Sequence, residues 1–205
     1  MIADQRAAEI VRGAINNAAS TYKDWTGGWW LSDSGCESLM VAITGRHLAS
    51  ENRKLGSARH QLTLETSLGF VRSKLSNPPK GAIPHTIAKS KRADIVLWSG
   101  DKPYGVIEIK RTQQLDGWRD DLNELRQLVH SYTDVVQFGL FGGFLVRSRK
   151  YYMDKARATI EKMTPDPRYK SLNEYLEWGP KVHYDPNNRS GDLTYQAVTI
   201  RISRK

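Results

Sequence analysis

Two apolar segments joined by a short polar turn constrain the fold of this chain more than any other feature. Residues 91–98 (KRADIVLW) and 106–111 (VIEIKR) are connected through a Ser-Gly-Asp-Lys-Pro turn and predict a β-hairpin. Side chains along a strand alternate between its two faces, so Glu108 and Lys110 lie on the same face, about 6.6 Å apart. The turn can also bring Asp94 beside Glu108. We therefore expect two carboxylates and an ammonium to share one edge of a sheet.

These charges lie in strands that otherwise have the composition of a core. The run Ile95-Val96-Leu97-Trp98 is continuous, which is typical of a strand buried on both faces. An isolated Glu-x-Lys triplet is most often an ordinary surface ion pair that adds little stability. Charges inside a buried strand are costly unless they serve a site, and this favours a functional site here. Two carboxylates and a lysine suit a hard divalent cation with an activated water.

This pattern resembles the PD-(D/E)xK nuclease superfamily, which has the restriction-endonuclease-like fold, over Lys91 to about Val146. In that family the first Asp and the Glu of the ExK unit hold Mg²⁺, for which Mn²⁺ can substitute. The Lys orients the attacking water or helps to deprotonate it. The resemblance implies these roles for Asp94, Glu108 and Lys110. Ala93 stands where many members have proline, and Glu-Ile-Lys is the only acidic-x-Lys triplet in a strand-like apolar run of this chain.

A further carboxylate from a helix commonly joins such sites in the family, and the resemblance implies Glu37 as a catalytic residue and metal ligand. The Ser-Asp-Ser sequence at 32–34 supplies N-cap chemistry for a helix, and Glu37 lies beside the apolar side of that helix. Glu65 is the alternative if residues 57–75 form the core helix. Many members also carry a Gln shortly after the ExK unit that contacts the site or nucleic acid. Gln114 is the candidate, although a solvated helix start explains it equally well.

The charge balance indicates a polyanionic partner. The formal net charge is +9 and the isoelectric point is near 9.7, and cations that neutralise phosphates release counterions from nucleic acid. We expect nucleic acid, double-stranded DNA in particular, and no membrane, because no basic amphipathic helix or lipidation motif is visible. The residues expected to contact nucleic acid are Lys89, Lys91, Arg92, Arg111 and Gln114. Cutting both strands usually implies a symmetric dimer or two binding events, so a homodimer is one expectation.

The order of the predicted elements indicates an α/β fold. We expect a central mixed β-sheet flanked by helices, with a restriction-endonuclease-like core at about 32–147, extra N-terminal helices and a C-terminal hairpin. Residues 57–75 fit either a helix or the first strand. The other predicted elements are helices at 2–21, after 32–34, at 115–132, at 151–163 and at 172–178, and strands at 181–184 and 194–203. Residues 135–146 are predicted as a buried strand or as a pair of strands with a glycine break.

Length and composition indicate one domain, 1–205. A chain of 205 residues with 39% hydrophobic and 26% charged residues fits one full-sized globular domain. No apolar stretch reaches the length needed to span a membrane. The first residues lack the apolar segment of a secretory signal, and the single cysteine, Cys36, allows no internal disulfide. A cytoplasmic location is the expectation.

The favoured function is a metal-dependent DNA endonuclease of the restriction, phage-defence or mobile-element type. Two alternatives stay open at this point. One is a nucleic-acid-binding module that keeps the fold without cleavage, and the other is a nuclease that acts on RNA or requires an activating partner. Intact Asp94, Glu108 and Lys110 favour catalysis over the binding module.

Overall fold

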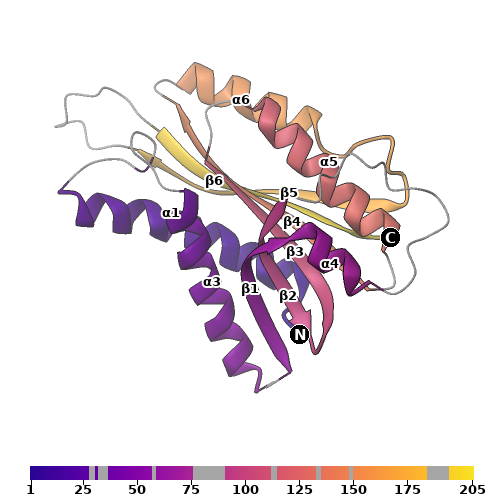
Figure 1. The fold of residues 1–205 in the computed structure, drawn as a ribbon. Coiled ribbons are helices and arrows are strands. Elements are labelled where there is room, and N and C mark those ends of the chain that lie inside the picture. Colours follow the sequence, from indigo (N-terminus) through magenta and orange to yellow (C-terminus); the bar gives the residue numbers. More distant parts are fainter. Residues whose placement is uncertain are drawn as a thin grey trace.

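A six-stranded mixed sheet forms the centre of the molecule (Figure 1). The computed structural model describes residues 1–27, 31, 37–56, 59–75, 91–111, 115–132, 135–147, 150–183 and 194–205. The strand order is β1-β2-β3-β4-β6-β5. Only β3 and β4 are parallel among neighbours; the other pairs are antiparallel. The strands are β1 (His60–Ser67), β2 (Arg92–Ser99), β3 (Lys102–Arg111), β4 (Phe138–Arg147), β5 (Leu172–His183) and β6 (Thr194–Arg204).

Helices cover both faces of the sheet, which confirms the predicted α/β class with a central mixed sheet. The helices α1 (Asp4–Trp25) and α3 (Glu37–Lys54) pack on one face, and α5 (Asp116–Ser131) and α6 (Lys150–Lys162) pack on the other (Figure 1). The short helix α4 (Leu68–Ser73) follows β1 and adds to the α5 side. None of the described helices combines the length and apolar character needed to cross a membrane.

The sheet separates two hydrophobic cores, and strand alternation decides which side chain joins which core. In the hairpin, Ile95 and Ile107 face the α1 and α3 core, whereas Val96 and Val106 face the α5 and α6 core. Glu108 continues the second alternation on β3 and is therefore expected on the face that α5 covers. On β2 the alternation breaks next to Asp94, because Ala93 also packs in the α5 and α6 core.

The ambiguous stretch at 57–75 contains one strand and one short helix. Its alternating half forms β1 beside β2, and the remainder forms α4, with Leu68 and Val71 buried. The run predicted at 135–146 is a single strand, β4. The helices predicted at 2–21, after 32–34, at 115–132 and at 151–163 are also present as α1, α3, α5 and α6.

The short helix predicted at 172–178 is wrong. These residues belong to β5, which runs without interruption to His183 and pairs with β6. The physical reason is that the residues that face the core recur at every second position, which is the period of a strand. Leu172, Leu176 and Trp178 pack against the α5 and α6 core, and Glu174 on the same face forms a buried salt bridge with Arg126 of α5. The final two strands thus complete the same sheet as the β2–β3 hairpin.

The β2–β3 ladder ends before either strand does. The last pair is Ile95 with Ile107. Beyond it, β2 stays paired with β1 as far as Arg92, and β3 stays paired with β4 as far as Arg111. The two central strands therefore part into a fork, with Asp94 and Glu108 as the first residues past the last pair.

Candidate active site

Asp94 and Glu108 face each other across the start of this fork. The pair Ile95–Ile107 places them opposite one another on neighbouring strands. Both are buried, with 8% and 7% of their surfaces exposed. The backbone N–H of Ile109 donates a hydrogen bond of 2.6 Å to Oδ2 of Asp94. This bond takes the place of a ladder hydrogen bond and fixes the Asp94 carboxylate beside β3.

Burial makes both carboxylates hold protons more tightly than usual. It raises the pKa of Asp94 to about 6, although the Ile109 hydrogen bond and Lys110 oppose the rise. It also raises the pKa of Glu108 well above its ordinary value, and the neighbouring charges of Asp94 and Asp121 add to the effect. The described residues make no hydrogen bond or salt bridge to the Glu108 carboxylate. Such a pair has a high affinity for a proton or for a cation.

Lys110 supplies the positive charge at the site, and carboxylates from two helices flank it. Its Nζ lies 3.4 Å from Oε1 of Glu37 and 3.7 Å from Oδ2 of Asp121. Burial alone would lower the pKa of Lys110, but the surrounding carboxylates, with Asp121 and Glu37 the largest, raise it above its ordinary value. The Lys110 side chain therefore keeps its proton and its positive charge.

Glu37 lies beside Lys110, and its described partners are Lys110 and the backbone of β3. Besides the Lys110 hydrogen bond, its Oε2 accepts a hydrogen bond of 3.0 Å from the N–H of Arg111. No group of three His, Cys, Asp or Glu side chains is arranged to hold a metal ion in the described part of the chain. Glu37 as a metal ligand stays a prediction.

Glu65, the alternative third carboxylate, lies on β1 and not on a helix. The pairs Leu64–Ile95 and Thr66–Ala93 bracket it, so it stands opposite Asp94. Its φ of +50° is in the left-handed region, which is uncommon for a residue with a side chain. Glu65 is exposed, yet its charge contributes to the raised pKa of Asp94.

Two carboxylates of α5 at the site were not among the predicted site residues. Asp121 lies against Lys110, and Glu124, one turn later, pairs with Lys91. Burial raises the pKa of Asp121 even though Lys110 opposes the rise. Their spacing of three residues puts both on one side of a helix, which is the sequence signal that could have found them. The rotation of α5 that aims this side at β3 depends on packing.

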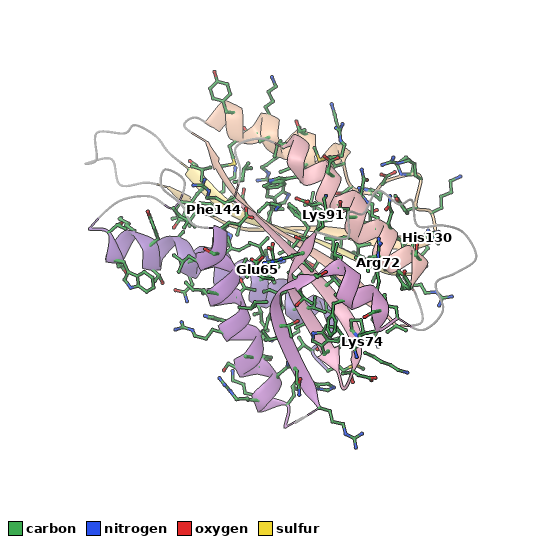
Figure 2. All side chains as sticks on the ribbon, viewed as in Figure 1. Glu65, Arg72, Lys74, Lys91, His130 and Phe144 are labelled. Atoms are coloured by element: carbon green, nitrogen blue, oxygen red, sulfur yellow. The ribbon has the colours of Figure 1, made fainter. Side chains whose placement is uncertain are left out.

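The residues predicted to contact nucleic acid lie in different settings. Lys91, labelled beside α5 in Figure 2, is tied to Glu124. Arg92 is exposed at the first position of β2. Arg111 is half-buried, and its Nη1 donates a hydrogen bond of 3.0 Å to the carbonyl of Leu31. The other two predicted residues, Lys89 and Gln114, lie outside the described residues.

Comparisons with protein-family models, with curated proteins and with solved structures returned no match. The chemistry of the site is therefore read from its own geometry. Two facing buried carboxylates with a neighbouring ammonium can bind a small hard cation and can place positive charge next to a phosphate.

Proposed function

We propose that this chain is a metal-dependent nuclease of the PD-(D/E)xK type, and specifically a DNA endonuclease. The observation that carries the proposal is the facing pair of buried carboxylates, Asp94 and Glu108, with the ammonium of Lys110 two residues further along β3. Burying two like charges together is unfavourable, and no cation among the described residues lies within salt-bridge distance of either carboxylate. A catalytic role accounts for this arrangement better than a structural one.

The residues fit a divalent cation. Asp94 and Glu108 offer hard oxygen donors, and burial, the main cause of their raised pKa values, makes their charged forms costly without a bound cation. Mg²⁺ usually takes only one or two protein carboxylates, with water and substrate phosphate as its other ligands, so a group of three side chains is not required. Asp94 and Glu108 would hold the ion, and Mn²⁺ suits the same donors. When bound, the ion polarises the phosphate and lowers the pKa of a water.

The chain's own residues supply positioning and charge. The Ile109 N–H occupies one oxygen of Asp94 and leaves the other oxygen without that constraint. Lys110 keeps its proton because of the carboxylates around it, which supports a role in orienting the attacking water and stabilising developing phosphate charge. Proton abstraction by Lys110 does not fit this raised pKa. Glu37 anchors the lysine from α3.

The substrate class follows from charge. The surplus of nine positive charges over the whole chain attracts a polyanion, while the acidic site itself would repel phosphate without a cation. Phosphodiester hydrolysis of double-stranded DNA is the reaction that best fits both properties.

The test is a cleavage assay with the purified chain. Supercoiled plasmid, linear duplex, single-stranded DNA and RNA are incubated with Mg²⁺, with Mn²⁺ or with EDTA. We expect plasmid nicking or linearisation that EDTA abolishes and that Glu108→Gln abolishes without loss of folding. Glu161→Gln, at an exposed position of α6, is the matched control. Cleavage by the Glu108→Gln protein at the wild-type rate would refute the proposal. DNA binding without cleavage under any condition would favour the binding module.

A further inference from the structure

Among the described residues, Asp121 is the carboxylate of α5 that forms a salt bridge with Lys110. Its Oδ2 lies 3.7 Å from Nζ of Lys110. The contact is shielded from solvent, because the side chains of Asp121 and Lys110 are only 17% and 29% exposed. Partly buried ion pairs are screened less by salt than exposed ones. The contact can therefore influence where the ammonium rests.

Packing of α5 holds Asp121 at a fixed place. Trp118, one turn earlier, is fully buried and its ring centre lies 5.0 Å from that of Phe141. The same ring covers Gly143 so closely that a Cβ there would lie 2.3 Å from it. Leu122, next to Asp121, is also fully buried. The helix therefore has no freedom to rotate Asp121 away without disturbing the core.

Two carboxylates draw the ammonium from two directions. Glu37 comes from α3 on one face of the sheet and Asp121 from α5 on the other. An ammonium has three N–H donors and rotates freely about its long side chain. Contact with one carboxylate restrains the side chain, whereas contact with two from different directions locates the charge.

We propose that Asp121 is a positioning residue, which holds the Lys110 ammonium together with Glu37 beside Glu108 during phosphodiester hydrolysis. The inference rests on the proposed function for its catalytic consequence. The contact itself does not depend on that function. A purely structural ion pair would support folding without affecting turnover by the folded enzyme.

Steady-state kinetics of Asp121→Asn separate the two roles. We expect kcat to fall by about 10- to 100-fold, because small misplacements of a catalytic group are costly. KM for DNA and the Mg²⁺ concentration for half-maximal rate should not rise. Asp121→Glu should recover part of the rate. The matched control is Asp120→Asn, which removes the same charge from the neighbouring exposed position of α5. Equal kcat values for the Asp121→Asn and Asp120→Asn proteins would overturn the proposal.

A second measurement does not need cleavage. The ¹⁵N signal of the Lys110 ammonium, assigned by its loss in Lys110→Met, reports the mobility of the side chain. We expect its order parameter to fall in Asp121→Asn and to stay unchanged in Asp120→Asn. A fall in order without nuclease activity in the wild type would refute the proposed function but support the positioning contact. An unchanged order parameter in Asp121→Asn would overturn the positioning contact whatever the activity.

Discussion

At the scale of single residues, Asp94 lowers the stability of the folded chain at neutral pH. Its pKa is about 6 in the folded state, above its ordinary value of 3.8. Between these two pH values the folded state binds more protons than the unfolded state, so stability falls as pH rises through this window. Above the folded-state pKa of about 6, this loss of folding stability is complete. A buried carboxylate that lowers the stability of the fold is typical of a functional site.

Asp94→Asn is therefore expected to stabilise the metal-free protein. Asn keeps the size of the side chain and an oxygen that can accept from Ile109, and it removes the charge. We expect the free energy of unfolding at pH 7.5 in EDTA to rise by about 1 to 3 kcal/mol. The gain should shrink as pH falls from 6 toward 4. Urea unfolding across this pH range measures it.

Two further results belong to the same experiment. Mg²⁺ should raise the unfolding midpoint of the wild type at pH 7.5, because a ligand that binds only the folded state stabilises it. Asp94→Asn should reduce that response. Equal stability of the variant and wild type in EDTA at every pH would contradict the raised pKa of Asp94.

At the scale of elements, α3 and β1 offer competing third carboxylates. Glu37 begins α3 and contacts both Lys110 and the backbone of Arg111. Glu65 lies on β1, is exposed and reaches Asp94 through its charge alone among the described contacts. The geometry favours Glu37 over Glu65 as the third carboxylate in the proposed reaction.

Substitution by Gln at each position tests this difference. Glu37→Gln should lower the cleavage rate by at least about tenfold, because it removes the charge that anchors Lys110. Glu65→Gln should stay within about twofold of the wild type. Plasmid cleavage over a range of Mg²⁺ concentrations measures both the rate and the metal requirement. A larger loss in Glu65→Gln than in Glu37→Gln would reverse the assignment.

The same elements show how far sequence reasoning reaches. Asp94, Glu108 and Lys110 lie within seventeen consecutive residues of one hairpin, 94–110, so alternation and a turn suffice to bring them together. Glu37 was predicted through the family resemblance. Asp121 was not among the predicted site residues. Its spacing with Glu124 marks one side of α5, but the direction in which that side points depends on how Trp118 packs over Gly143.

The wrong helix at 172–178 has a related cause. Glu174 occupies a core position of β5, where a charged residue breaks the apolar alternation expected of a strand. It is buried because Arg126, 48 residues away, neutralises it through hydrogen bonds of 2.9 and 2.7 Å. The partner that makes the strand possible is invisible to a local reading. A similar limit applies to 57–75. The helical spacing of Leu64, Leu68 and Val71 runs across the boundary between β1 and α4, so it does not show where the strand ends.

At the scale of the whole molecule, the proposed function requires positive charge to hold DNA around an acidic site. Lys91 is already paired with Glu124, so it has less charge to offer a phosphate. Arg92, the next residue, is exposed at the first position of β2. The two neighbours therefore differ in what they contribute to binding, although the sequence presents them as one basic run.

The salt dependence of DNA binding should distinguish them. In EDTA, log K for a duplex is expected to fall linearly with log salt, by about 0.9 for each neutralised phosphate. Arg92→Gln should flatten this slope by about one contact, and Lys91→Gln should flatten it less. Fluorescence anisotropy with a labelled duplex gives both slopes. An affinity that salt does not change would argue for a different kind of partner.

The fork between β2 and β3 has a mechanical consequence. Past Ile95 and Ile107, no further ladder pair ties the two strands that carry Asp94 and Glu108; the tie that remains there is the hydrogen bond from Ile109 to Asp94. Each strand is instead anchored outward, to β1 and to β4. The gap between the carboxylates can therefore widen or narrow with little loss of backbone pairing. Under the proposed function, cations of different radius are therefore expected to fit between the two carboxylates, because strand pairing does not fix the separation of Asp94 and Glu108.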